Sequence, residues 1–142
     1  MDDKKKIRSS CAISQSLDIF GDKWSLLIIR DLVYLGKETY GDLLKMEEGI
    51  ATNVLADRLV LLEKEGIVTK EIFAGSKSKF KYKLTQKGID IYPIIMEILF
   101  WGVKYYEVKP EQRLVAKFNK QEREAFVKDV MKKRMKELAG KS

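Results

Sequence analysis

The residues best suited to chemistry in this chain are four closely spaced polar side chains, Thr52, Asn53, Asp57 and Arg58. An Asn amide can bond adenine in bidentate fashion, a Thr hydroxyl can bond a base or touch a thymine methyl, and an Asp can accept from cytosine. Thr52, Asn53 and Asp57 therefore favour reading of DNA bases. Two other interpretations stay open, because Thr52 can cap a helix and Asp57 can pair with Arg58 or a nearby lysine.

A helix over residues 52–64 must hold these side chains. At 100° per residue, three leucines share one face, which we expect to join the core: Leu55, Leu59 and Leu62. Asn53 and Asp57 lie on the opposite face. The small side chains of Ala51 and Ala56 suit close approach to a base edge, so we expect this helix to face DNA with its N-terminal half.

A lysine-rich hairpin is predicted directly after this helix. Residues 67–73 have the β-branched content of a strand, residues 74–79 form a Gly/Ser/Lys loop, and residues 80–84 alternate apolar and lysine side chains. Lys77 and Lys79 lie at the predicted tip, where they can contact backbone phosphates. The alternative is that the tip is a solubilising loop.

Short helices are predicted before the polar set. They cover residues 14–20, residues 23–35 with Asp22 as N-cap and Gly36 as stop, and a third short helix that begins at an N-cap Thr39. These elements supply the apolar surface on which the 52–64 helix can rest.

Residues 85–106 predict one long helix, kinked at Pro93 because proline removes a backbone donor. Its side chains are apolar on almost every side, and such a helix must be buried. We therefore expect a second copy of the chain to cover it. The predicted dimer contacts are Ile95, Leu99, Trp101 and Tyr105. The tail is an alternative or additional cover, since Asn119 can cap an amphipathic helix over residues 120–138.

Composition places the chain among ordinary globular proteins. At 142 residues it can form one core and bury about 68% of the surface of its unfolded chain. The net charge of +7 comes mostly from residues 104–142, which carry 12 basic and 6 acidic side chains, whereas residues 1–103 carry 16 and 15. A basic surplus suits binding to phosphates, although any one cluster can be a solvated face.

Several classes of chemistry are excluded by composition. One cysteine cannot form an internal disulfide, and without histidine neither a Cys/His zinc site nor a histidine-based triad can be built. We expect no cofactor and no enzymatic activity. The N-terminus lacks the apolar core of a secretory signal and no stretch is long enough to span a membrane, so we expect a cytoplasmic protein without a membrane partner.

Six motifs, in this order and spacing, resemble the HxlR family of bacterial and archaeal winged-helix transcriptional regulators, which are relatives of the MarR group. They are C-A-I-S (11–14), G-D-K-W-S-L-L-I-I-R-D-L (21–32), Y-G-D-L (40–43), G-I-A-T-N-V-L-A-D-R-L-V-L-L-E-K-E-G-I-V (49–68), Y-K-L-T-Q-K-G (82–88) and Y-P-I-I (92–95). Each motif alone is weak, but the resemblance that they carry together runs from residue 11 to about residue 102, roughly two thirds of the chain.

The resemblance implies a mainly α fold with a small β-hairpin: a winged helix-turn-helix with a long C-terminal dimerisation helix and, here, an extra basic C-terminal helix. It divides the chain into a DNA-binding and dimerisation domain over residues 1–108 and a basic helical extension over residues 109–142. It implies that residues 49–63 hold the turn and recognition helix of a dimer that binds double-stranded DNA. The DNA-facing residues would be Tyr40, Ala51, Thr52, Asn53, Ala56, Asp57, Arg58, Lys77 and Lys79.

Two features depart from the family pattern. The hairpin carries lysines before Tyr82 where relatives often carry prolines and a glutamate, and the tail continues beyond Pro110. The role of the tail therefore cannot be carried over from the family.

Cys11 stands where some members of the family keep a thiol that senses oxidants or electrophiles. It could act in the same way, or answer a small-molecule effector, if it is exposed and if Arg8 or Lys23 lowers its pKa. The other interpretation, which matches the commonest fate of a free cysteine, is a small buried apolar residue.

A regulator of transcription is therefore the function that the sequence predicts first. The alternative is a winged-helix module that binds protein or RNA and has no operator specificity, with the basic tail adding affinity.

Overall fold

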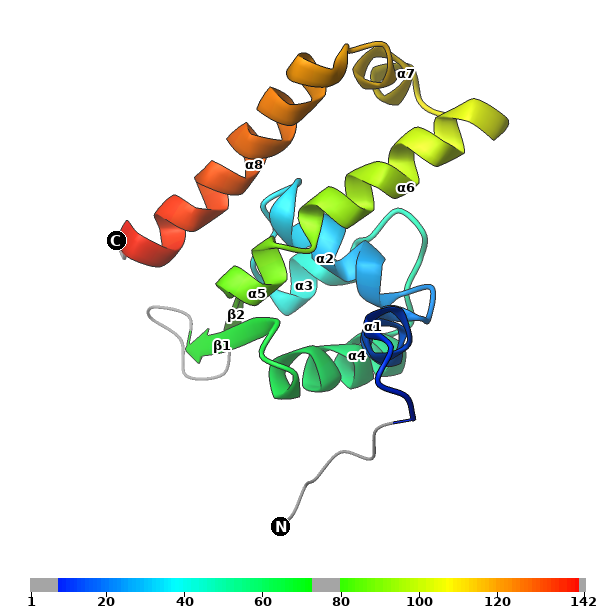
Figure 1. Cartoon of the computed structure of the whole chain (residues 1–142). Helices are drawn as coiled ribbons and strands as arrows, with labels where there is room; N and C mark the ends of the chain where they lie inside the picture. The colour runs from blue at the N-terminus through cyan, green and yellow to red at the C-terminus, as the bar shows by residue number, and fades with distance from the viewer. Residues whose placement is uncertain (1–7, 73–79, 141–142) are drawn as a thin grey trace.

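Residues 8–72 and 80–140, which a computed structural model describes, fold into a mainly helical molecule with one small antiparallel sheet (Figure 1). In chain order the elements are α1 (Ala12–Phe20), α2 (Ser25–Val33), α3 (Tyr40–Leu44), α4 (Thr52–Lys64), β1 (Val68–Ile72), β2 (Phe80–Leu84), α5 (Gln86–Ile89), α6 (Tyr92–Tyr105), α7 (Pro110–Ala116) and α8 (Lys120–Gly140). This order confirms the predicted fold class. Lys77 and Lys79 lie outside the described residues.

The first three helices follow the predicted signals with small shifts at their ends. The carboxylate of Asp22 accepts from the backbone N–H groups of Trp24 and Ser25 at 2.9 and 3.0 Å, so α2 begins at Ser25 and not at residue 23. After α2, Gly36 takes a positive φ of 71°, a conformation that favours glycine. Thr39 then starts α3, as predicted.

A capping box fixes the start of α3. The Thr39 hydroxyl accepts from the Asp42 N–H at 3.0 Å, and the Asp42 carboxylate accepts from the Thr39 N–H at 3.4 Å. Burial acts to raise the pKa of Asp42, but the hydrogen bonds with Thr39 outweigh it and hold that pKa below its ordinary value.

One core joins the winged helix to α6. Its fully or nearly fully buried members are Ile28, Ile29, Leu32, Val33, Leu43, Met46, Ile50, Leu55, Leu59, Leu62, Ile67, Val68, Tyr82, Leu84, Ile89, Ile91, Tyr92 and Met96. The three leucines predicted to form the inner face of α4 are among them. Burial of a leucine of this kind stabilises the fold by roughly 1.5–3 kcal/mol.

The hairpin is attached to the helices on its β2 side. β1 and β2 pair antiparallel, with Val68 opposite Leu84 and Ile72 opposite Phe80. The backbone N–H of Tyr82 also donates to the carbonyl of Glu38 at 2.7 Å, which ties β2 to the segment between α2 and α3. The alternation predicted for β2 is confirmed, because Tyr82 and Leu84 are buried.

The predicted single helix over residues 85–106 is wrong in one respect, since it is two helices. α5 ends at Ile89, and α6 begins at Tyr92 with Pro93 in its first turn, where the missing N–H of proline breaks no helical hydrogen bond. Gly88 allows α5 to pack closely against the backbone of Ile67, because a Cβ at this position would overlap the Ile67 carbonyl oxygen. The proline therefore starts a helix and does not kink one.

Helices α7 and α8 follow α6 and turn back along it (Figure 1). α7 is not among the predicted elements. The start of α8 matches its prediction, because Asn119 and Glu122 form a capping box through hydrogen bonds of 2.8 and 2.9 Å. One side of α8 packs on the core through Phe126, Val127, Val130, Met131 and Met135.

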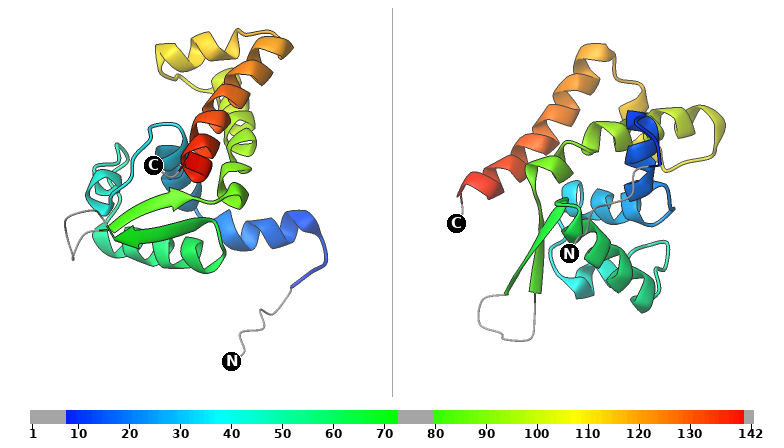
Figure 2. Two further views of the ribbon diagram at one scale, coloured as in Figure 1. Left: turned by 90° about the vertical axis from the view of Figure 1, so that its left-hand side faces the viewer. Right: turned by 60° about the horizontal axis from the view of Figure 1, so that its bottom comes forward.

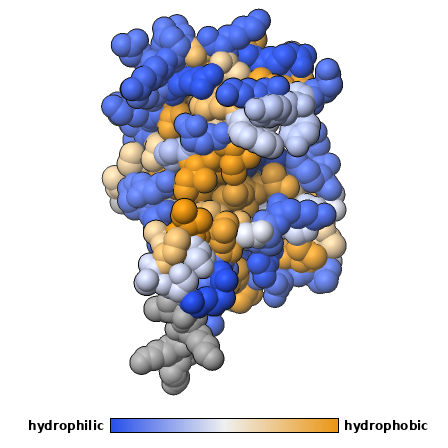
Figure 3. Space-filling view, turned by 45° about the vertical axis from the view of Figure 1, so that its right-hand side comes forward, coloured by the Kyte–Doolittle hydropathy of each residue, from blue (hydrophilic) through white to orange (hydrophobic). Residues whose placement is uncertain are grey.

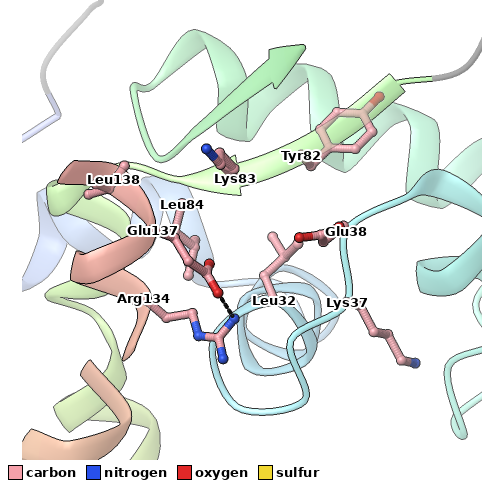
Figure 4. A pocket seen from close by; sticks show the side chains of 9 residues that line it. All are labelled: Leu32, Lys37, Glu38, Tyr82, Lys83, Leu84, Arg134, Glu137 and Leu138. Carbon is pink, nitrogen blue, oxygen red and sulfur yellow. Dashed lines mark hydrogen bonds and ion pairs between the residues drawn. The ribbon is translucent and has the colours of Figure 1, made fainter. Parts of the chain in front are cut away.

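The end of α8 rests on β2 and on the segment between α2 and α3 (Figure 4). Arg134 pairs with Glu137 at 2.9 Å, and its guanidinium packs beside Gly36, 3.4 Å from the position that a Cβ there would take. The space between these elements is only about 10 Å³, so this contact is a closed seam.

Candidate nucleic-acid interface

The N-terminal half of α4 lies on the surface at the end of the molecule opposite α7 (Figures 1 and 2). The side chains predicted to face DNA are exposed: Ala51, Thr52, Asn53, Ala56 and Asp57. The three leucines on the other side of α4 are buried, so their packing in the core fixes the direction in which the polar side of α4 points. This half of α4 therefore presents amide, hydroxyl and carboxylate groups to a partner that lies against it.

The start of α4 is held by α3. The Tyr40 hydroxyl donates to the backbone carbonyl of Thr52 at 2.9 Å. Tyr40 is half-buried, which suits a residue that positions α4 beside a surface. The alternative reading of Thr52 as an N-cap is wrong, because the N-cap is Ala51 and no side chain caps this helix.

Arg58 is engaged with two carboxylates at the edge of this surface. It contacts Asp57 at 2.9 Å and Asp22 at 3.4 Å, and its side chain is 25% exposed. The hydrogen bond with Asp57 raises the pKa of Arg58. The pairing of Asp57 with Arg58 that the sequence left open is therefore present, and it leaves Asp57 itself 71% exposed.

A charged network under α4 was missed at the level of sequence. Asp31 is completely buried in α2, where its carboxylate contacts Arg30 at 2.8 Å and Lys37 at 2.8 Å. Arg30 reaches on to the turn before α4 and forms a bidentate pair with Glu48, at 2.8 and 2.9 Å. The hydrogen bond from Arg30 lowers the pKa of Glu48. An acidic residue inside the apolar run I-I-R-D-L-V is the signal that could have indicated it.

The two lysines of β2 are close to carboxylates. Lys81 lies 3.9 Å from Glu38, and Lys83 lies 3.9 Å from Glu71. Both pairs are near the surface, where such contacts contribute little to stability.

Cys11 is exposed at the N-cap of α1, so the expectation that it is a buried apolar residue is wrong. α1 lies at the surface, and none of its residues is fully buried. The two cations expected to act on the thiol have other contacts: Arg8 pairs with Asp18, and Lys23 lies 5.1 Å from the ring of Trp24.

Apolar side chains gather in a band down one face of the molecule (Figure 3). On α6, a stripe of four side chains is exposed: Ile94 at 43%, Ile98 at 51%, Trp101 at 57% and Tyr105 at 66%. On α1, Ile13 and Leu17 are also exposed. Ile95 and Leu99, predicted as dimer contacts beside Trp101 and Tyr105, instead pack partly against the core of their own chain.

The described ranges 8–72 and 80–140 contain no group of three or more Cys, Asp or Glu side chains arranged to hold a metal ion. No helix in these ranges has the length and apolar character needed to cross a membrane.

Comparison with known proteins gives a consistent result. The sequence model of the HxlR-like helix-turn-helix family matches residues 19–110. YdeP of Bacillus subtilis, an uncharacterised helix-turn-helix transcriptional regulator, is 30% identical over 95 residues, which make up 67% of this chain and 73% of YdeP.

Two solved structures are similar over the same part of the chain. The crystal structure of PA1607, a candidate transcription factor, is 36% identical with a TM-score of 0.64 and covers 72% of this chain and 70% of its own. The redox regulator HypR in its oxidised form is 28% identical with a TM-score of 0.59, covering 69% of this chain and 100% of its own. The family match spans most of the chain and contains the whole of α4, and we conclude that this protein belongs to the HxlR-like helix-turn-helix family and is a transcriptional regulator of the helix-turn-helix type.

Proposed function

We propose that two copies of this chain bind one operator as a symmetric dimer, with α4 of each copy in the major groove. The observation that carries this proposal is the exposed polar half of α4, fixed to the core by its leucine face and to α3 by Tyr40. A recognition helix contacts base edges with its N-terminal residues, and a two-fold dimer places its two helices about 34–36 Å apart, one turn of DNA.

Base contacts and backbone contacts fall on different residues. Thr52, Asn53 and Asp57 are exposed on the polar half of α4 and can bond base edges. Arg58 lies at the edge of this surface and is assigned to a phosphate, which fixes register without reading sequence. To bond a phosphate, Arg58 must exchange its contact with Asp22 or Asp57 for it.

The test compares specific and non-specific binding. We expect Asn53→Ala and Thr52→Ala to weaken binding to DNA from upstream of the protein's own gene by roughly 1–3 kcal/mol each, and to leave binding to a scrambled duplex unchanged. The measurement is fluorescence anisotropy at fixed salt. Thr52→Ala keeps the backbone carbonyl that accepts from the Tyr40 hydroxyl, so the hydrogen bond that holds the start of α4 to α3 is preserved.

Gln121→Ala is the control, because it removes an exposed amide on α8, far along the chain from α4. Equal losses on operator and scrambled DNA would assign Thr52 and Asn53 to phosphate contact or folding. Saturable binding to RNA or protein, without sequence preference on DNA, would favour the interaction module instead.

The exposed apolar stripe on α6 supports the dimer. A helix face with four large apolar side chains in water is unfavourable for a monomer, and large exposed apolar patches mark interaction sites. Helix α8 covers a different side of α6, so the tail does not remove the need for a second cover.

We also propose that the exposed Cys11 thiol makes DNA binding responsive to oxidants, as the likeness to the redox regulator HypR suggests. Hydrogen peroxide would join the Cys11 thiols of two subunits in a disulfide and be reduced to two molecules of water. Peroxide should then change operator affinity at least severalfold in the native protein and not in Cys11→Ser. If both proteins respond alike in the anisotropy assay, Cys11 is not the sensor.

A further inference from the structure

A groove between α6, α7 and α8 combines aromatic and cationic side chains. It has a volume of about 640 Å³, within the range of about 300–1,000 Å³ that is usual for small-molecule sites. Its described lining residues are Glu97, Phe100, Trp101, Val103, Lys104, Arg113, Ala116, Lys117 and Arg123. Four of these are basic and one is acidic, so the groove is suited to an anion.

The basic side chains of the groove are not neutralised by the protein. Within the described ranges, no carboxylate pairs with Lys104, Arg113, Lys117 or Arg123. Arg113 donates to the carbonyl of Val108 at 2.8 Å, and Arg123 donates to the carbonyl of Ala116 at 2.6 Å. These bonds orient both guanidinium groups and leave their charges available to a ligand.

Arg123 supplies the most specific feature. Its guanidinium lies 3.9 Å from the centre of the Phe100 ring, in the geometry of a cation–π contact. Its Nε is buried and has no hydrogen-bond partner. A buried donor without a partner is unfavourable, and a carboxylate is the partner that a guanidinium bonds most strongly.

We propose that this groove binds a small organic anion that carries an aromatic body and a carboxylate. The aromatic body would lie against Phe100 and Trp101, and the carboxylate would meet Arg113, Lys117 and Arg123. An adjoining groove of about 560 Å³ shares Glu97, Phe100 and Arg123, but it adds Glu124 and has a more balanced charge. The anion therefore belongs in the first groove.

The site uses the part of the chain beyond the family match. Three of its four cations lie beyond residue 110, where the family model ends: Arg113 in α7, Lys117 directly after α7, and Arg123 in α8. The proposal concerns binding of a ligand and is tested without DNA, so its failure is distinguishable from failure of operator binding. Trp101 belongs both to this groove and to the α6 stripe proposed for the dimer, so the test also covers the outcome in which a second copy fills the groove.

The test is isothermal titration of the full chain with 2-naphthoate and with its neutral relative 2-naphthylmethanol. We expect the carboxylate to bind at least tenfold more tightly than the alcohol. Lys117→Gln should weaken the binding of naphthoate about tenfold, because it removes one cation from the groove. The variant should remain folded, since the Lys117 side chain is exposed. Lys132→Gln, which removes an exposed charge of α8 that does not line the groove, should leave the affinity unchanged.

Fluorine NMR of protein labelled with 5-fluorotryptophan locates the ligand, because the chain has only two tryptophans. Naphthoate should shift the Trp101 signal and not the Trp24 signal, with Trp24→Phe providing the assignment. Equal affinity for the alcohol, an unshifted Trp101 signal, or an equal loss in Lys132→Gln would overturn the proposal. Affinity that falls as protein concentration rises would also overturn it, because a second copy would then occupy the groove.

Discussion

Asp31 illustrates how single residues hold the surface that we propose to face DNA in place. A fully buried carboxylate is unfavourable unless it is paired, and Asp31 is paired with both Arg30 and Lys37. Through Arg30 the network continues to Glu48, in the turn that leads to α4. The residues that orient α4 are therefore these charged groups as well as its own buried leucines.

The pair between Arg30 and Glu48 predicts a pH dependence. Because the pKa of Glu48 is lower in the folded chain than its ordinary value of 4.5, its stabilisation is complete above that value and disappears as the pH falls through the lower folded pKa. Glu48→Gln should therefore reduce the free energy of unfolding by about 0.5–1 kcal/mol at pH 7. In urea unfolding the difference between the two proteins should shrink progressively as the pH is lowered below 4.5.

Glu63→Gln is the matched control, since Glu63 is an exposed carboxylate of α4 for which no ion pair is observed. A Glu48→Gln deficit that persists unchanged in acid would mean that the side chain acts through packing and not through charge.

Local residue patterns account for what could be predicted at this scale. The polar face of α4 was predictable because helical periodicity separates Asn53 and Asp57 from the leucines. The contact of Arg30 with Glu48 was not predictable, because the two residues lie 18 positions apart in the sequence and only the tertiary fold brings them together. The exposure of Cys11 was not predictable either, since sequence does not reveal which segments cover α1.

At the scale of elements, the boundary between α5 and α6 depends on close packing. Gly88→Ala should destabilise the fold by roughly 1–3 kcal/mol, because the new Cβ would overlap the Ile67 carbonyl and the Leu84 side chain. Gly102→Ala is the control with the opposite expected sign. Gly102 lies within α6 and a new Cβ there would meet no atom within 4 Å, so this substitution should raise the free energy of unfolding by about 0.5–1 kcal/mol. Thermal unfolding of both variants checks the prediction, and destabilisation of both would contradict it.

The same packing explains why sequence reasoning merged the two helices. Apolar residues recur at close spacing from Ile91 to Tyr106, and between Thr85 and Ile91 nothing in the pattern marks a second helix start, so periodicity alone indicates one helix. The break is set by the tertiary contact at Gly88 and by Pro93, which is as compatible with a helix start as with a kink.

At the scale of the whole molecule, the exposed stripe of α6 predicts a dimer at micromolar concentration. Ile98→Glu should produce monomers that remain folded, because Ile98 is half exposed and lies outside the core. Leu99→Glu should instead unfold the chain, because Leu99 packs on its own core. Sedimentation velocity with circular dichroism distinguishes these outcomes.

Leu114→Glu, on the exposed face of α7, should not change the sedimentation of the dimer. A native chain that sediments as a monomer would contradict the dimer. The order of α1 to α4 was predictable from helical periodicity and from the residues that start and stop helices. The second cover of α6 was not, since sequence shows that a face is apolar but not which surface meets it.

The position of α8 also governs how the protein is made. α8 is synthesised after every element on which it packs, and its 21 residues take about 1–4 s at a translation rate of about 5–20 residues per second. Until α8 has been made, the apolar surfaces of α2, α5 and α6 on which it packs face water, although α1 to α4 have already been synthesised. A nascent chain paused before residue 120 therefore carries α4 on an uncovered core, and it should require a chaperone more than the protein with α8 does.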